Sequence, residues 1–342
     1  MQVHQKKPEK QTEKKVLAAQ GAAGFHKLGY MAGPLFFYLC GTAVTEGILS
    51  ILFVLFVVLS GTEAAKTGLV PFLAQNAYWL LAAGSGILLP AFFLRRYHAD
   101  WQRRVTGDPP RFQERESGVD KCGPIRLFLD IPQKGLLFLT ALLAAIGLTA
   151  GVNLLSSMGL PVLEGVAEEN AAMQSTNAWV VFLVTVGIVP FFEELVFRGL
   201  CYRRIRDYFG FGTAALVSAA AFGMLHGNLG QALFAFGMGL FLAWVYERSN
   251  MLAAAVLCHA AANAVNFVLL AIEAGWVSLG KIFTAAENAG ALSAQPAPVA
   301  GNSGGAALLL FLTAGGCFVF LIRRLSERLP REVYRLYTGK QA

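Results

Sequence analysis

The sequence predicts an all-α protein, a polytopic bundle of about eight transmembrane helices with both termini in the cytoplasm. Its composition is 56% hydrophobic and only 14% charged, with positive mean hydropathy. An ordinary soluble domain is about 25% charged, so a soluble core does not explain this balance. Long apolar runs and an uneven distribution of Lys and Arg between the loops are the other two observations behind the prediction.

Eight mainly apolar runs are each long enough to be a transmembrane helix. At 1.5 Å per helical residue, such a run crosses a hydrocarbon core of ~30 Å. The first run lacks a convincing small-residue cleavage site, so we expect a retained anchor and not a signal peptide. The predicted spans cover residues 32–59, 76–94, 135–155, 178–200, 212–227, 229–246, 251–272 and 305–322.

The positive charges fall on one side of these runs. Twenty-five of the 28 Lys and Arg residues lie in the terminal tails and in alternate loops, while the opposite loops hold only Lys66 and Lys281. The positive-inside rule then places both termini in the cytoplasm and favours an even number of spans. The net charge of +7 therefore reflects orientation in a cell membrane, and we expect the lipid bilayer and no nucleic acid as a partner.

Charge and composition also divide the chain into segments. A Gln- and Lys-rich start predicts a mobile tail, and an Ala-, Gly- and Pro-rich stretch before the last run predicts a flexible external loop. The five cysteines show no paired spacing, so neither a disulfide framework nor a zinc ribbon is expected. The predicted segments are a basic tail at 1–29, two leading spans at 30–94, a cytoplasmic loop at 95–133, a core of spans at 134–273, an external loop at 274–304, a last span at 305–323 and a basic tail at 324–342.

Ionisable side chains are costly in hydrocarbon, so those inside the spans are candidates for function. Counting 1.5 Å per residue from the cytoplasmic ends puts Glu193 roughly 15 Å deep, His226 roughly 20 Å and His259 roughly 12 Å. Three helices thus bring polar groups to one layer. The ionisable residues and amides well inside the spans are Glu46, Glu193, Glu194, Arg198, His226, His259, Asn263 and Asn266.

Helical geometry assigns partners to several of these residues. Glu194 and Arg198 are four residues apart on one face and are expected to form an ion pair, while Glu193 points about 100° away and stays free for another partner. On a later helix, His259, Asn263 and Asn266 form one stripe. That stripe can present an imidazole and an amide to a common cavity.

Three ordered motifs make this region recognisable: Glu193-Glu194-Leu195-Val196-Phe197-Arg198, then Phe222-Gly223-Met224-Leu225-His226, then His259-Ala260-Ala261-Ala262-Asn263. They resemble the CPBP family of glutamic intramembrane proteases, which includes the type II CAAX prenyl endopeptidases and bacteriocin-processing or immunity proteins. The family pattern of Glu-Glu-x-x-x-Arg, Phe-x-x-x-His and His-x-x-x-Asn is matched without a departure. The resemblance covers about residues 178–267 and leaves the leading and last spans outside.

The resemblance implies an intramembrane endopeptidase that cleaves a membrane-anchored or hydrophobic peptide or protein substrate without a cofactor. It implies that Glu193 and His226 activate a water, and that His259 and Asn263 form an oxyanion hole. The chemistry of the residues agrees, because a buried carboxylate suits a general base and an imidazole and an amide suit a developing oxyanion. Arg198 is expected to hold Glu194 charged as a structural support of the site.

Other functions remain open at this point. Glu193, His226 and His259 could form a two-His, one-carboxylate metal site, although the zinc-protease motif His-Glu-x-x-His is absent and no metal is expected. The same polar cluster could serve a transporter, a proton relay or a non-catalytic scaffold. Gly84-Ser85-Gly86 could hold a serine nucleophile, but we expect a close contact between helices there. Glu46 and Asn266 receive no role.

Overall fold

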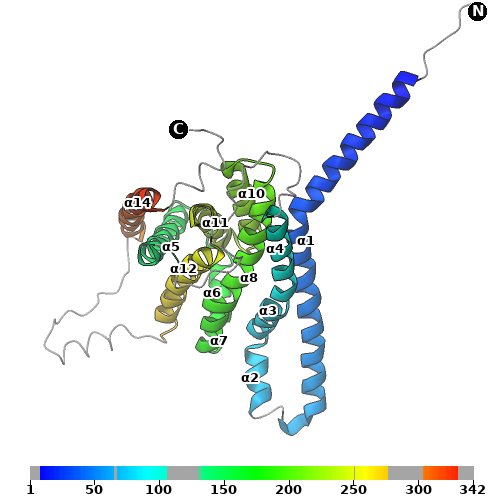
Figure 1. The fold of residues 1–342 in the computed structure, drawn as a ribbon. Coiled ribbons are helices and arrows are strands. Elements are labelled where there is room, and N and C mark those ends of the chain that lie inside the picture. Colours follow the sequence, from blue (N-terminus) through cyan, green and yellow to red (C-terminus); the bar gives the residue numbers. More distant parts are fainter. Residues whose placement is uncertain are drawn as a thin grey trace, which may run out of the picture.

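The computed structural model describes residues 8–64, 68–105, 131, 133–249, 251–275 and 303–329. These residues form α- and π-helices joined by short turns, with no strand among them (Figure 1). The predicted all-α class is thus confirmed. Of the segments predicted as loops, most of 95–133 and of 274–304 lie outside the described residues, as does the end of the chain after residue 329.

Seven helical stretches of the described chain are long and apolar enough to cross a membrane. They confirm seven of the eight predicted spans, and the eighth, predicted at 212–227, is a shorter apolar helix. The helices involved are α1 (Pro8–Ala64), α3 (Ala77–Leu88) continued by α4 (Pro90–Val105), α5 (Lys134–Ser157), the stretch from α7 to α9 (Ala178–Arg206), α10 (Phe211–Met224), α11 (Leu229–Ser249), α12 (Leu252–Glu273) and α14 (Ser303–Arg328). Two short helices, α2 (Leu69–Gln75) and α6 (Val166–Gln174), complete the described chain.

Helices α1 and α4 extend furthest beyond the predicted spans. Helix α1 begins at Pro8, inside the segment predicted as a mobile tail, and α4 continues to Val105, inside the predicted cytoplasmic loop. Both extensions contain residues that favour helices, such as Lys, Glu, Gln, Ala and Arg. Apolar runs therefore located the membrane crossings but did not locate the ends of these helices.

The stretch that carries the Glu pair alternates between α- and π-helix. It consists of α7 (Ala178–Phe182), the π-helix η2 (Leu183–Ile188), α8 (Val189–Glu194), the π-helix η3 (Leu195–Tyr202) and α9 (Arg203–Arg206). Pro190 lies near the start of α8, where its missing N–H removes one helical hydrogen bond. Because π-helical turns are rare and often lie at functional sites, this stretch is a candidate for function on backbone geometry alone.

Small residues let neighbouring helices approach closely around this stretch. A Cβ on Gly84 would lie 2.5 Å from Leu49, and a Cβ on Gly86 would lie 2.7 Å from Ile188. The predicted close contact at Gly84-Ser85-Gly86 is therefore confirmed. Between α10 and α11, a Cβ on Gly223 would lie 2.8 Å from the Ala232 carbonyl oxygen, so these two helices also pack backbone to backbone.

The remaining helices surround this centre. Helices α1, α3 and α4 lie on one side, while α5 and α14 pack together on the other, with α12 between α5 and the Glu-bearing stretch (Figure 1). Buried ion pairs tie the predicted cytoplasmic ends together: Arg204 contacts Asp100 at 2.7 Å, and Arg206 contacts Glu247 at 3.0 Å. These contacts fix the register of the helices that hold the site.

Candidate active site

Glu194 and Arg198 form the predicted ion pair at the centre of the bundle. Arg198 Nη1 donates to Glu194 Oε1 at 2.6 Å, and both side chains have no exposed surface. Arg198 Nη2 also donates to the Gly239 carbonyl on α11 at 3.2 Å, and a Cβ on Gly239 would lie 3.4 Å from that nitrogen. The guanidinium neutralises a carboxylate that hydrocarbon would otherwise destabilise. The glycine serves the close packing of α11 on α10, because a Cβ there would lie 2.9 Å from the Ala219 Cβ.

Glu194 has a second partner that the helical angles did not predict. His259 Nδ1 lies 2.9 Å from Glu194 Oε1, the same oxygen that accepts from Arg198. An ionised carboxylate only accepts hydrogen bonds, so His259 Nδ1 is the donor and carries a proton. Glu194 therefore fixes both the orientation and the tautomer of His259. Sequence spacing identifies partners within one helix, whereas this contact joins two helices.

Glu193 is separate from the Arg198 pair, as the angular argument predicted. Its Oε2 lies 3.7 Å from His259 Nε2, and its side chain is 15% exposed, whereas that of Glu194 is fully buried. His259 is therefore placed between two carboxylates, one on each ring nitrogen. Of the two adjacent glutamates, Glu193 is the one that a water or substrate can reach.

His226 lies in the turn after α10 and not within a spanning helix as predicted. Its Nδ1 lies 2.9 Å from the Phe222 carbonyl oxygen, and because a carbonyl oxygen only accepts, Nδ1 carries the proton. In a neutral His226 the other ring nitrogen, Nε2, then has a free lone pair. His226 is near enough to the Glu193 carboxylate for a favourable electrostatic interaction.

The stripe on α12 divides between two neighbours. Asn263 Nδ2 donates to the carbonyl of Thr185 in η2 at 2.8 Å, while Asn266 Oδ1 accepts from Thr149 on α5 at 3.4 Å. Asn263 thus remains beside the Glu-bearing stretch, one turn from His259. Asn266, which received no role, links α12 to α5.

Phe222 is a shared platform that sequence reasoning left without a role. Its ring centroid lies 5.0 Å from that of His226 and 5.6 Å from that of His259, both edge-to-face. Arg198 stacks over the same ring at 4.8 Å. The sequence signal that could have identified Phe222 is its position four residues before His226, because its carbonyl then reaches the imidazole one helical turn later.

Residues from the leading helices lie next to the Glu pair. Tyr38 on α1 packs its ring at 5.3 Å from Phe192 and at 5.8 Å from Phe197, and it is within electrostatic range of Glu193. Glu46 accepts a hydrogen bond from Ser85 on α3 at 3.3 Å. Ser85 therefore has an acidic partner and not the buried histidine that a serine nucleophile requires.

The described part of the chain contains no group of three or more His, Cys, Asp or Glu side chains arranged to hold a metal ion. Its four cysteines, Cys40, Cys201, Cys258 and Cys317, are all free thiols. Absence of a metal from the reaction remains a prediction, which chelation can test.

Comparison with known proteins identifies the class of this central region. Residues 175–265 match the family described as Type II CAAX prenyl endopeptidase Rce1-like, and this range contains every residue of the three motifs. The described helices indicate a multi-pass membrane protein, and its residues 175–265 are similar to a peptidase family. No curated protein matches the chain, and no solved structure does.

The region at 175–265 is thus similar to the Rce1-like family, in agreement with the predicted resemblance to the CPBP family. The matched range begins before α7 and ends within α12. It leaves out α1, α3, α4, α5 and α14. The family match therefore says nothing about any contribution of those helices to the site, which is known from the structure alone.

Proposed function

We propose that the protein is an intramembrane glutamic endopeptidase that hydrolyses a peptide bond of a membrane-associated substrate. The observation that carries the proposal is the position of Glu193, the partly accessible member of a buried Glu pair, beside an imidazole whose other nitrogen is held by Glu194. The match to a family of prenyl endopeptidases supports peptide hydrolysis.

The residues support a direct attack by water. Glu193 takes a proton from a water while His226, whose Nε2 has the free lone pair, orients that water; the resulting hydroxide adds to the scissile carbonyl carbon. The carbonyl oxygen becomes an oxyanion. The proton then passes to the amine that leaves when the carbon–nitrogen bond breaks, and Glu193 returns to its carboxylate form.

In the proposed reaction, His259 Nε2 and the second N–H of Asn263 Nδ2, whose first N–H is donated to the Thr185 carbonyl, stabilise the oxyanion. Because Glu194 fixes the first proton of His259 on Nδ1, donation from Nε2 requires an imidazolium with a second proton. The carboxylates of Glu193 and Glu194 flank that ring and stabilise its positive charge. A charged donor stabilises a developing oxyanion more than a neutral donor does.

The test is Glu193→Gln, which keeps the size of the side chain and removes its basicity. We expect it to abolish cleavage of a prenylated peptide and of endogenous membrane proteins, the latter followed by comparing N-terminal peptides in wild-type and variant membranes. Glu46→Gln is the matched control, because Glu46 is another carboxylate inside the membrane that contacts Ser85 and not His259. Folded protein is quantified by size-exclusion chromatography in detergent.

Wild-type turnover by Glu193→Gln, measured per folded molecule, would refute the glutamic mechanism. A variant that loses cleavage but keeps a wild-type phenotype in cells would instead identify a scaffold that does not depend on turnover.

A further inference from the structure

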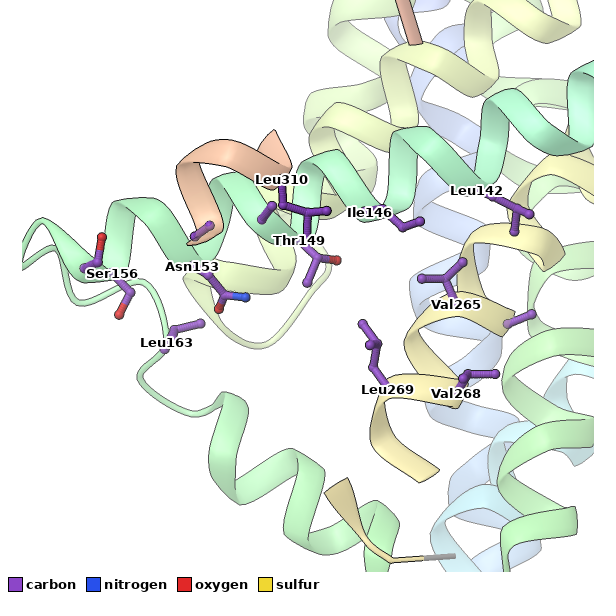
Figure 2. A pocket seen from close by; sticks show the side chains of 14 residues that line it. Leu142, Ile146, Thr149, Asn153, Ser156, Leu163, Val265, Val268, Leu269 and Leu310 are labelled. Carbon is purple, nitrogen blue, oxygen red and sulfur yellow. The ribbon is translucent and has the colours of Figure 1, made fainter. Parts of the chain in front are cut away.

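A large cavity lies on the far side of α12 from the candidate active site. It is bounded by α5, α12 and α14 and has a volume of about 1050 Å³ (Figure 2). Ligand cavities of proteins commonly measure about 300–1,000 Å³. On α12 its lining residues are Ala264, Val265, Val268 and Leu269. Because successive helical residues turn by about 100°, these four lie on the face roughly opposite to that of His259 and Asn263.

The chemistry of this cavity changes along its length. Leu142 and Ile146 line one end, whereas Asn153, Ser156 and Ser157 lie towards the other, near the end of α5 (Figure 2). The described lining residues include no charged side chain. From Leu142 to Ser157, α5 rises about 22 Å at 1.5 Å per residue, which exceeds the ~15 Å half-thickness of a hydrocarbon core. The cavity is thus a long apolar groove with a polar end.

We propose that this groove binds an acyl chain of a bilayer phospholipid, with the ester and glycerol oxygens at the Asn153–Ser157 end. Apart from Leu163, all its lining residues belong to candidate membrane spans, so we expect hydrocarbon around the groove. An empty groove would forfeit the dispersion contacts of its lining, and a lipid chain restores them without requiring any hydrogen bond. The amide and hydroxyl groups at the polar end supply donors for the ester oxygens.

A peptide is a poorer occupant of the same groove. Backbone N–H and C=O groups need partners in hydrocarbon, and over the Leu142 end the lining is apolar. Nor would a peptide bound there reach the site, because Asn263 is directed away from the groove to the Thr185 carbonyl. The lipid is therefore a resident that supports α12 from behind. This inference goes beyond the proposed protease activity and does not depend on it.

The contact between Thr149 and Asn266 shows how occupancy could affect α12. Thr149 lines the groove and bonds across to Asn266, so the two walls are joined at one level. An acyl chain that fills the groove keeps these two walls apart at the other levels of the groove. Removing it leaves α12 with fewer contacts on that face.

The experiment uses the purified full chain in nanodiscs that contain a trace of phosphatidylcholine with a photoactivatable diazirine on one acyl chain. After irradiation, digestion and mass spectrometry locate the adducts. A diazirine at the chain end should label peptides around Leu142 and Ala264, and one near the ester should label peptides around Asn153 and Ser157. This polarity follows from the position of the polar residues.

Two variants fill the groove from different walls: Ala264→Trp on α12 and Ala307→Trp on α14. The matched control is Ala43→Trp on α1, an exposed alanine outside the groove. We expect adducts in the groove to fall about tenfold in both variants, the change in binding constant that corresponds to 1.4 kcal/mol, and to stay unchanged in the control. If one variant fails to fold, the other still decides the result.

Two outcomes would overturn the proposal. Equal labelling of the groove in Ala264→Trp, Ala307→Trp and control would show that the adducts arise from random lipid contact. Loss of labelling on addition of a prenylated peptide, with no loss on addition of excess unlabelled phosphatidylcholine, would assign the groove to substrate. Neither outcome tests Glu193, so failure here leaves the proposed function intact.

Discussion

Glu194 accepts hydrogen bonds from Arg198 and His259 on one oxygen, and so joins the two halves of the site. Its other oxygen, and Arg198 Nε, have no hydrogen-bond partner among the described residues. Burying this carboxylate costs desolvation free energy. Replacing either member of the buried pair would leave the charge of the other uncompensated. We interpret Glu194 as a positioning residue that acts through His259.

Arg198→Ala is the sharpest test of this support. It should lower the yield of folded protein as well as activity, because it leaves the Glu194 charge uncompensated at a cost of about 3–5 kcal/mol. Glu193→Gln, by contrast, should leave the folded yield near wild type. Folded yield and rate per folded molecule are measured together in detergent, and equal yields for the two variants would contradict the distinction.

Asn263→Ala should slow cleavage without abolishing it. Loss of one oxyanion donor typically costs about 10² to 10³ in rate. Asn266→Ala is the control on the same helix, since Asn266 bonds to Thr149 and not to the Glu-bearing stretch. If both variants cleave equally well, Asn263 serves only to fasten α12 to η2.

At the scale of elements, the close packing of α10 on α11 holds Phe222 in contact with both Arg198 and His226. Gly223→Ala should destabilise the protein by about 1–3 kcal/mol, because the new methyl meets a backbone carbonyl that cannot rotate away. Gly212→Ala in the same helix is the control: a Cβ there meets nothing within 4 Å. Thermal unfolding in detergent compares the two, and a similar melting temperature for both would contradict the packing argument.

The elements also show what sequence could and could not predict. Hydropathy located the spans, and the four-residue spacing of Glu194 and Arg198 predicted their ion pair, because both signals are local. The contact of His259 with Glu194 and the approach of Tyr38 to Phe192 join segments far apart in the chain, and neither leaves a periodic signal. The π-helices were also missed, since a run such as Leu195–Tyr202 has the same apolar character in either helical form.

For the whole molecule, the charge distribution predicts orientation. A reporter fused after residue 342 should be cytoplasmic, and one inserted near residue 290 should be external, as the positive-inside rule requires. Accessibility of each fusion to a membrane-impermeant reagent is the measurement. An external C-terminus would refute the predicted topology of both termini in the cytoplasm.

Activity of the purified protein should survive strong chelators, because the proposed reaction uses Glu193 and His226 on water and requires no metal. Turnover of a prenylated peptide is measured before and after dialysis against chelator. Loss of activity that zinc alone restores would reassign Glu193, His226 and His259 as metal ligands.

The short apolar helix α10 has a consequence for the surrounding lipid. Its 14 residues cover about 21 Å at 1.5 Å per residue, well under the ~30 Å of a hydrocarbon core. Leu216, Val217 and Met224 are exposed along it, so we expect bilayer lipids to contact this helix directly. Hydrophobic mismatch of this kind is relieved by local thinning of the bilayer. We expect such thinning to bring the membrane–water interface closer to the turn that holds His226, and so to supply water to the proposed hydrolytic site.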